Sequence, residues 1–269
     1  MLHITGKLDN GYHNMQSVFF FIDHLCDFLM FDTERSFDEQ AVDSDNSVYH
    51  AYSFLKDRYR SEIPLVNLTK NIPVSAGLGG GSSDAACFLY TVLHDVWSIS
   101  INEIIDIAKD SHALGMDVPV FMHKLIYRSN LFFLDNGVGK FSEILMLPEM
   151  EPIFILIVND GKTKLNTKSV FNRFVNEETK HMPTLDMMYI IDNLQHCQNS
   201  LQETAIKMKP CIEGILNDID SSGAIFSRIS GSGSSCFGVY DSMQSLATAE
   251  YILKGRYPIV VSNCIHHST

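Results

Sequence analysis

The sequence has few basic residues and no long apolar run. Its 269 residues include 20 lysines and arginines against 32 aspartates and glutamates, a formal net charge of −12. Broad binding to nucleic acid or to an anionic membrane surface needs a basic field, so we expect neither partner. The longest apolar runs, 18–22 and 153–158, are far shorter than the ~18 residues or more of a membrane-spanning helix.

The chain also lacks the patterns of secretion and of cysteine-based sites. Its first residues show no basic stretch followed by a long apolar one, which predicts a cytoplasmic protein without a signal peptide. The six cysteines are scattered, with no Cys-x-x-Cys pair. We therefore expect reduced thiols and no metal held by dedicated protein ligands.

The most informative segment is rich in glycine, yet it lacks the features of two familiar phosphate loops. It does not end in Gly-Lys-Ser/Thr, and it does not follow the Gly-x-Gly-x-x-Gly pattern with an acidic residue ~20 positions later. Glycines let successive backbone N–H groups converge, and a following helix N-terminus favours an anion. We therefore predict that a nucleotide phosphate binds here, although a loop whose glycines serve only a tight turn remains an alternative. The predicted loop consists of Pro73, Val74, Ser75, Ala76, Gly77, Leu78, Gly79, Gly80, Gly81, Ser82 and Ser83.

A helix is predicted directly after this loop. Apolar residues recur from Ala86 to Trp97 at intervals of three and four, as on the buried face of a helix. Ser82 or Ser83 is expected to cap its start, with Asp84 in the first turn.

The rest of the chain reads as a mixture of short strands and helices, so the predicted fold class is α+β. The Pro-flanked stretch near position 150 is the expected domain boundary, with domains at 1–149 and 150–269. Asp-Asn-Gly at 9–11 and Asn-Gly at 136–137 predict hairpin turns. Strands are expected at 2–7, 15–21, 27–31, 66–70, 153–158, 236–240 and 259–262, and helices at 48–59, 100–114, 168–174, 187–194 and 202–216.

Three segments together resemble one family. The loop at 73–86, the stretch Gly115-Met116-Asp117-Val118-Pro119 and the second glycine-rich loop at 230–237 are similar in order and spacing to the GHMP kinase superfamily. That resemblance implies ATP and Mg²⁺ as cofactors. It also implies an amino-terminal domain like domain 2 of ribosomal protein S5 and a ferredoxin-like carboxy-terminal domain. Residues 2–13 and Gln16 look most like the substrate-side signature of the members that phosphorylate cytidine diphosphate methylerythritol in the non-mevalonate isoprenoid pathway.

The resemblance also implies roles for individual residues. Residues 73–83 would surround the ATP phosphates, and the Ser82 and Ser83 hydroxyls are available to phosphate or magnesium. Asp117 would be the general base that accepts the proton of the acceptor hydroxyl; the alternative is an ordinary helix-end carboxylate. The substrate-binding residues would be Tyr12 and His13 at the cytosine, Thr167, and Gly231, Ser232 and Gly233 at the substrate phosphates. His13 could instead be an ordinary surface or core histidine, and the 230–235 loop a plain turn.

The chain departs from the family at its start and in one inner motif. Relatives have a lysine-containing segment just before the equivalent of Leu2, and here the chain starts at Met1. We expect a start codon assigned too late; a catalytically impaired nucleotide-binding pseudokinase, or a GHMP kinase acting on homoserine or mevalonate, are the alternatives. Asn199-Ser200-Leu201-Gln202 is a weaker version of the family's Asn-Asp-Leu-Glu segment. The expected assembly is a monomer or a homodimer.

Overall fold

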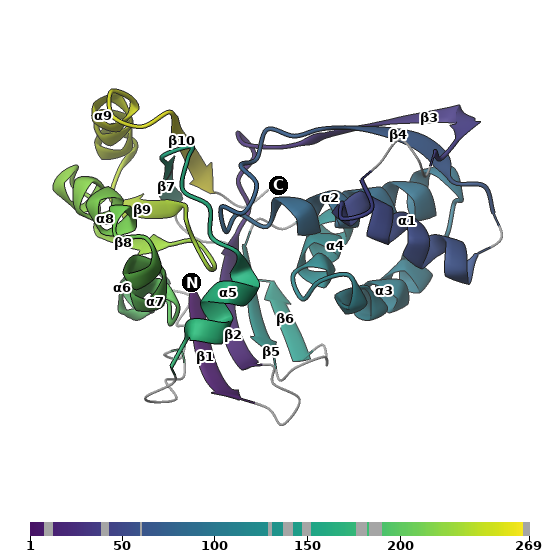
Figure 1. Ribbon diagram of the computed structural model, residues 1–269, viewed down its shortest axis with the longest axis horizontal. Helices are drawn as coiled ribbons and strands as arrows, with labels where there is room; N and C mark the ends of the chain where they lie inside the picture. The colour runs from purple at the N-terminus through teal and green to yellow at the C-terminus, as the bar shows by residue number, and fades with distance from the viewer. Residues whose placement is uncertain are drawn as a thin grey trace. The chain divides into compact units, whose positions relative to one another are not determined.

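The computed structural model describes the residues in two compact units (Figure 1). Unit 1 comprises residues 1–25, 73–78 and 130–269, and unit 2 comprises residues 26–72 and 79–129. The chain therefore passes from one unit to the other inside the predicted phosphate loop, after Leu78. The described residues are 1–7, 13–38, 43–59, 61–128, 131–136, 142–146, 152–175, 182 and 190–265. The domain boundary at 149/150 stays a prediction.

Unit 2 is a helical layer packed on a two-stranded antiparallel ribbon. The ribbon pairs β3 (Phe28–Ser36) with β4 (Pro64–Thr69). The helices are α1 (Ser47–Arg58), α2 (Gly80–Tyr90), α3 (Ile101–Asp110) and α4 (Val118–Tyr127), with a π-helical continuation of α2 at Thr91–Val96 and a short 3₁₀ turn at Ser111–Ala113.

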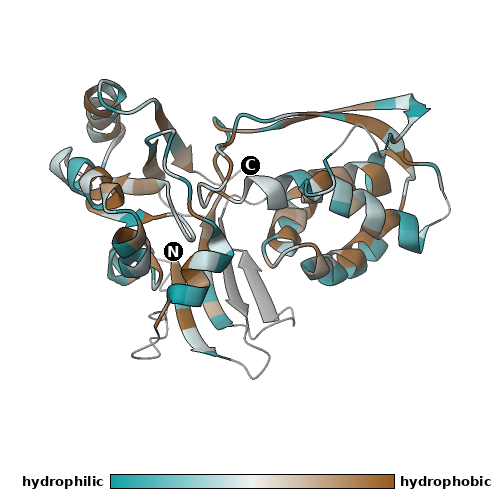
Figure 2. Cartoon of the chain, viewed as in Figure 1, coloured by the Kyte–Doolittle hydropathy of each residue, from teal (hydrophilic) through white to brown (hydrophobic). Residues whose placement is uncertain are grey.

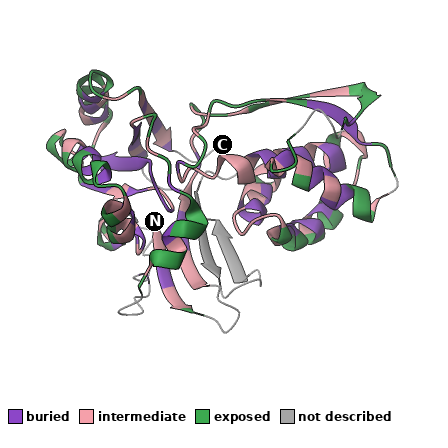
Figure 3. Ribbon diagram, viewed as in Figure 1, coloured by how far each residue is buried: buried purple, intermediate pink, exposed green. Residues whose placement is uncertain are grey.

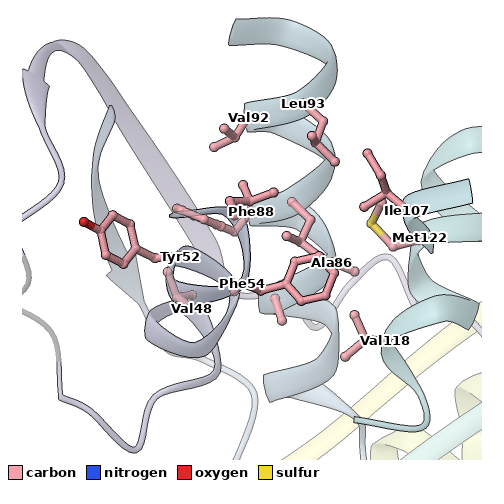
Figure 4. Close-up of a cluster of buried hydrophobic side chains, with 14 of the residues drawn as sticks. Val48, Tyr52, Phe54, Ala86, Phe88, Val92, Leu93, Ile107, Val118 and Met122 are labelled. Atoms are coloured by element: carbon pink, nitrogen blue, oxygen red, sulfur yellow. The ribbon is translucent and has the colours of Figure 1, made fainter. Parts of the chain in front are cut away.

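The core of unit 2 forms around α2 (Figure 4). Phe88 and Leu89 are fully buried, and the side chains of α1 and α4, such as Phe54 and Met122, belong to the same cluster. The apolar residues of these helices lie on their inward faces, and their exposed faces are polar (Figures 2 and 3). This burial holds the helix that follows the glycine-rich loop in a fixed position.

Unit 1 contains two four-stranded antiparallel sheets. The first has the order β1-β2-β5-β6, formed by β1 (Leu2–Lys7), β2 (His13–Phe20), β5 (Leu131–Asn136) and β6 (Ser142–Met146). The antiparallel pairing of β1 with β2 and of β5 with β6 is the pairing that the two hairpin signals predict. The turn residues 9–11 and 137 themselves lie outside the described residues.

The second sheet has the order β10-β7-β9-β8. Its strands are β7 (Ile153–Asn159), β8 (Phe226–Ile229), β9 (Cys236–Tyr240) and β10 (Ile259–Ile265), and the helices of this part are α5 (Thr167–Arg173), α6 (Ile190–His196), α7 (Gln202–Met208), α8 (Cys211–Ser221) and α9 (Met243–Lys254). Along the chain, β7 is followed by helices, then by β8 and β9, then by α9 and β10. This succession, with this sheet order, is a ferredoxin-like arrangement. The expected α+β fold with a ferredoxin-like carboxy-terminal part is thus confirmed.

The start of α2 differs from the start that the sequence pattern predicts. Helix α2 begins at Gly80 with Gly79 as its N-cap, so the prediction that Ser82 or Ser83 caps it is wrong, and Asp84 lies beyond the first turn. Glycine takes the cap because the backbone there is left-handed, with φ of 68° at Gly79.

Two further helices differ from the sequence patterns. The predicted helix at 202–216 is two helices, α7 and α8, separated at Lys209 and Pro210, because proline cannot donate the hydrogen bond that an uninterrupted helix needs. Strand β8 and helices α4 and α9 were not predicted. In the described part of the chain, no helix combines the length and apolarity needed to cross a membrane.

Candidate active site

The second half of the glycine-rich loop leads into an N-terminus of α2 that no side chain caps. Gly79 is the left-handed N-cap, and no side chain bonds to the free N–H groups of the first turn. A Cβ atom on Gly79 would lie 2.8 Å from Cζ of Phe121, and one on Gly81 would lie 2.6 Å from Oγ of Ser47. Gly79 also has a φ of 68°, which favours glycine at this position, and the uncapped N–H groups can receive an anion.

The Asp117 segment lies against this helix start in unit 2. A Cβ atom on Gly115 would lie 3.6 Å from Oγ of Ser82, and Phe121 of α4 abuts Gly79 as described. The structure thus brings together two motifs that are more than 30 residues apart in the sequence. Asp117 is the N-cap residue of α4, and its side chain makes no capping hydrogen bond, so the first turn of that helix does not occupy the carboxylate.

Burial changes the acidity of Asp117. The residue is half-buried by its exposed area, and desolvation raises the pKa of its carboxyl above the usual value. A carboxylate with a raised pKa is a better proton acceptor than an ordinary surface aspartate.

The first half of the glycine-rich loop packs against the second glycine-rich loop within unit 1. Ser230 Oγ donates to the carbonyl of Gly77 at 2.9 Å, and the Ser235 N–H donates to the carbonyl of Ala76, also at 2.9 Å. A Cβ atom on Gly77 would lie 2.2 Å from the carbonyl oxygen of Ser230, so the two backbones meet without room for a side chain. The N–H of Leu165 donates to the carbonyl of Ser75 at 3.2 Å.

Thr167 and Ser232, which were predicted from separate motifs, are direct partners. Their hydroxyl oxygens lie 2.9 Å apart. Thr167 is the first residue of α5, whose N-cap Asn166 accepts a hydrogen bond from the Ser169 N–H at 3.0 Å. Gly231 and Gly233 both have positive φ, at 53° and 80°. The two hydroxyls and these turns make a polar group within unit 1.

His13 lies close to two aromatic side chains. Its ring centroid is 5.6 Å from that of Phe171 and 6.0 Å from that of Phe174. Desolvation, and then the positive charge of Lys7, lower the pKa of His13, which favours a neutral imidazole with one donor and one acceptor nitrogen. Tyr12, the other residue predicted at this place, lies outside the described residues.

The sequence interpretation assigned no role to Phe171, Phe174 or Asn199. The first two are three apart directly after Thr167, which is a weak signal in a sequence. Asn199 is 5% exposed and makes three hydrogen bonds. Its Nδ2 donates to the carbonyls of Ile229 at 3.0 Å and Gly231 at 2.8 Å, and its Oδ1 accepts from the Leu201 N–H at 2.9 Å. This side chain therefore fixes the backbone of the second glycine-rich loop.

No metal held by dedicated protein ligands was expected. Among the described residues, no group of three or more histidines, cysteines or carboxylates could hold a metal ion. Mg²⁺ in kinases typically needs only one or two protein oxygens besides nucleotide phosphates and water. The Ser82 and Ser83 hydroxyls at the start of α2 are oxygen donors of that kind. These residues therefore fit a magnesium ion that arrives with a nucleotide.

Comparison with known proteins identifies the protein family to which this chain is similar. The model of the GHMP kinases N terminal domain matches residues 46–124, and that of the GHMP kinases C terminal matches residues 183–258. A curated relative from Bartonella tribocorum (strain CIP 105476 / IBS 506), named 4-diphosphocytidyl-2-C-methyl-D-erythritol kinase, is 31% identical over 275 residues, which cover 96% of this chain and 89% of the relative. A relative of the same name from Anaplasma marginale (strain Florida) is 32% identical over 274 residues, covering 96% and 90%.

Solved structures show the same fold. A crystal structure of 4-(cytidine 5'-diphospho)-2C-methyl-D-erythritol kinase superposes with a TM-score of 0.79 at 23% identity, covering 99% of this chain and 96% of the other. Homoserine kinase from Cytophaga hutchinsonii superposes with a TM-score of 0.64 at 13% identity, covering 100% and 94%. At these identities the superpositions establish the fold alone.

Proposed function

Since this chain belongs to the GHMP kinases, and within them to the 4-diphosphocytidyl-2-C-methyl-D-erythritol kinase family, we propose that it transfers the γ-phosphoryl group of ATP to the 2-hydroxyl of 4-diphosphocytidyl-2-C-methyl-D-erythritol. The reaction is an alcohol phosphorylation in the non-mevalonate isoprenoid pathway. A cytoplasmic location, and a monomer or homodimer as the working form, belong to the same proposal.

The nucleotide phosphates bind at the glycine-rich loop and the N-terminus of α2. Free N–H groups and the positive end of the helix dipole neutralise phosphate charge there. The Mg²⁺ ion, when bound, neutralises charge on the phosphate oxygens. Phosphoryl transfer depends mainly on such positioning and charge neutralisation.

Asp117 accepts the proton of the acceptor hydroxyl. As this proton leaves, the hydroxyl oxygen forms a bond to the γ-phosphorus, and the bond from the γ-phosphorus to the bridging oxygen of ADP breaks. The raised pKa of the carboxyl and the absence of a capping hydrogen bond leave Asp117 suited to this step.

The acceptor is held by residues of unit 1. His13, with Tyr12, binds the cytosine, because a neutral imidazole offers both a donor and an acceptor nitrogen. Thr167, Ser232 and the N–H group of Gly231 hydrogen-bond the diphosphate, whereas the Gly233 N–H donates to the carbonyl of Ser230 at 2.8 Å and holds the turn.

The observation that supports the proposal most strongly lies within unit 2. The Gly115–Asp117 segment packs beside Ser82 at the start of α2, so a carboxylate with a raised pKa lies near the helix end that suits a phosphate. An ordinary turn of glycines would not require this juxtaposition.

The first test is ADP release with Mg-ATP and 4-diphosphocytidyl-2-C-methyl-D-erythritol, with homoserine and mevalonate as comparison substrates. We expect turnover with the cytidyl substrate alone, and a loss of about 10²–10⁴-fold in kcat for Asp117→Asn, the usual contribution of a general base. Asp110→Asn, at an exposed carboxylate of the same unit, serves as the control and keeps full activity. Nucleotide binding without turnover would instead indicate a pseudokinase, and turnover with homoserine or mevalonate would contradict the substrate assignment.

A further inference from the structure

A buried charge cluster in unit 2 plays no part in the chemistry described above. The Lys70 ammonium donates to Oδ2 of Asp84 at 2.7 Å and also to Oδ2 of Asp27. The two carboxylate side chains are only 3% and 1% exposed, whereas Lys70 is 30% exposed. One cation thus lies between two buried anions that would otherwise repel each other.

Asp27 holds the backbone that enters the glycine-rich loop. Its Oδ1 accepts hydrogen bonds from the N–H groups of Asn71 at 2.6 Å and Ile72 at 2.8 Å. The Asn71 side chain donates in turn to the carbonyl of Cys26 at 3.0 Å. The entry stem of the loop is therefore tied to the residue just before β3.

Asp84 and Gly80 belong to the stem that leaves the loop. Both lie in α2, whose position is set by the buried core of unit 2 (Figure 4). A Cβ atom on Gly80 would lie 3.0 Å from Cγ2 of Ile72 and 3.4 Å from Nζ of Lys70. The exit stem thus packs directly on the entry stem, and Lys70 joins the two.

We propose that Asp27, Lys70 and Asp84 form a stem clamp that closes the base of the glycine-rich loop and sets its conformation for binding the nucleotide phosphates. The three are positioning residues: they act through the backbone of the loop and need no contact with the reacting atoms. The inference rests on the proposed function for its effect on ATP, and on the geometry of unit 2 for its effect on the loop.

The physical reason is preorganisation. A glycine-rich loop has many accessible conformations, and each must be given up when a ligand orders it. Fixing both stems in advance lowers that entropic cost and increases affinity without adding a contact to the ligand. Charge-assisted hydrogen bonds shielded from water suit this purpose, because their directions are restricted.

The test compares two substitutions at Asp27 and one at Asp84 in the full chain. Asp27→Ala removes the acceptor of the two backbone N–H groups, Asp27→Asn keeps an oxygen there, and Asp84→Asn keeps the shape of the exit-stem side chain. Two readouts are taken: hydrogen exchange of peptides that cover residues 73–83, and the steady-state constants for Mg-ATP and for the acceptor.

Two matched controls separate the clamp from general stability. Asp106→Ala breaks an ion pair in α3, where Lys109 lies 2.6 Å from Asp106, away from the loop stems. Val92→Ala opens a cavity in the core around α2 and weakens unit 2 without touching the clamp.

For Asp27→Ala we expect faster exchange in the loop peptides and a KM for Mg-ATP raised about tenfold, roughly the effect of losing a hydrogen bond to a charged group. The kcat and the KM for the acceptor stay within about twofold. Asp27→Asn recovers most of the ATP effect, Asp84→Asn shows a smaller rise in the same constant, and neither control changes the loop exchange.

Unchanged loop exchange in Asp27→Ala, or an equal change in Val92→Ala, overturns the clamp. If the wild-type chain shows no turnover, the proposed function is contradicted. If, in the same experiments, hydrogen exchange in the loop is faster in Asp27→Ala and in neither control, the clamp is still supported. The two proposals can thus fail separately.

Discussion

At the scale of single residues, burial makes chemically identical carboxylates behave differently. Asp117 and Asp84 have raised pKa values because burial disfavours their charged forms. Asp27 has a lowered pKa, because burial is outweighed by its hydrogen bonds from Lys70 and from the N–H groups of Ile72 and Asn71. All three residues are the same letter in the sequence, which therefore does not distinguish their pKa values.

The shift at Asp84 predicts a pH dependence of stability. Burial raises the pKa of Asp84 from 3.8 to about 6, against the opposing effect of Lys70. Since the folded state holds its proton more tightly than the unfolded state, stability from this group is fully present below pH 3.8 and is lost as pH rises through about 6. Two pKa units correspond to at most about 3 kcal/mol.

Asp84→Asn cannot ionise and removes this contribution. We expect the stability of the variant, relative to the wild type, to improve as pH rises from 4 to 7, by about 1–3 kcal/mol. Urea unfolding at a series of pH values measures the difference, in which the other carboxylates cancel. Parallel profiles of the two proteins would contradict the prediction.

At the scale of secondary-structure elements, polar side chains cap several helix starts, and glycine forms the cap of the helix that follows the glycine-rich loop. Asn46, Ser100 and Ser242 cap α1, α3 and α9 through their side chains. Helix α2 begins on Gly79 instead, with no side-chain cap. Its free N–H groups remain available to a ligand because no side chain occupies them.

A cap substitution tests this distinction in α3. Ser100 Oγ accepts from the Glu103 N–H at 3.4 Å, a long hydrogen bond, so Ser100→Ala should cost about 0.5–1 kcal/mol, the lower part of the usual range. Unfolding can be followed by fluorescence of Trp97, which lies in the same unit and donates to the carbonyl of Glu62 at 2.9 Å.

Ser53→Ala in the interior of α1 is the control for the cap. Its hydroxyl donates to the carbonyl of Tyr49 at 3.1 Å, a local bond that contributes little to a helix, and alanine has the higher helix propensity. We expect little change or a slight gain in stability. A loss equal to that of Ser100→Ala would remove the special role of the cap.

At the scale of the whole molecule, stability rests on packed cores and not on covalent links. All six cysteines are free, with Cys26 and Cys211 exposed and Cys197 and Cys236 buried. Burial raises the pKa of the Cys197 and Cys236 thiols, which keeps them in the unreactive protonated form.

Thiol reactivity checks this arrangement. With a disulfide exchange reagent at neutral pH, Cys26 and Cys211 should react in the native protein, and Cys197 and Cys236 only after unfolding. A reducing agent should leave the thermal midpoint unchanged. A midpoint that falls on reduction would reveal a disulfide and contradict the prediction.

Most strands and helices of the fold could be predicted, because their signals are local. The β1–β2 pairing follows from a hairpin turn, and α3 from Ser100 and an apolar stripe. Strand β8 and helices α4 and α9 were missed. The predicted site residues for nucleotide and acceptor stay predictions of function, but the structure shows which of them are neighbours: Ser82 beside Gly115, and Thr167 beside Ser232.

By itself the sequence determined which residue types are present and how they are spaced. It has glycines where a backbone must approach closely, an aspartate in a GHMP-like motif, and enough apolar periodicity for an α+β fold. Only the tertiary structure decided that His13 lies close to Phe171 and Phe174, and that Lys70 joins Asp27 to Asp84. His13 is more than a hundred positions from both phenylalanines in the chain, and Lys70 is not adjacent in sequence to either aspartate. Their contacts, burial and pKa values arise from packing, which no local spacing of residues encodes.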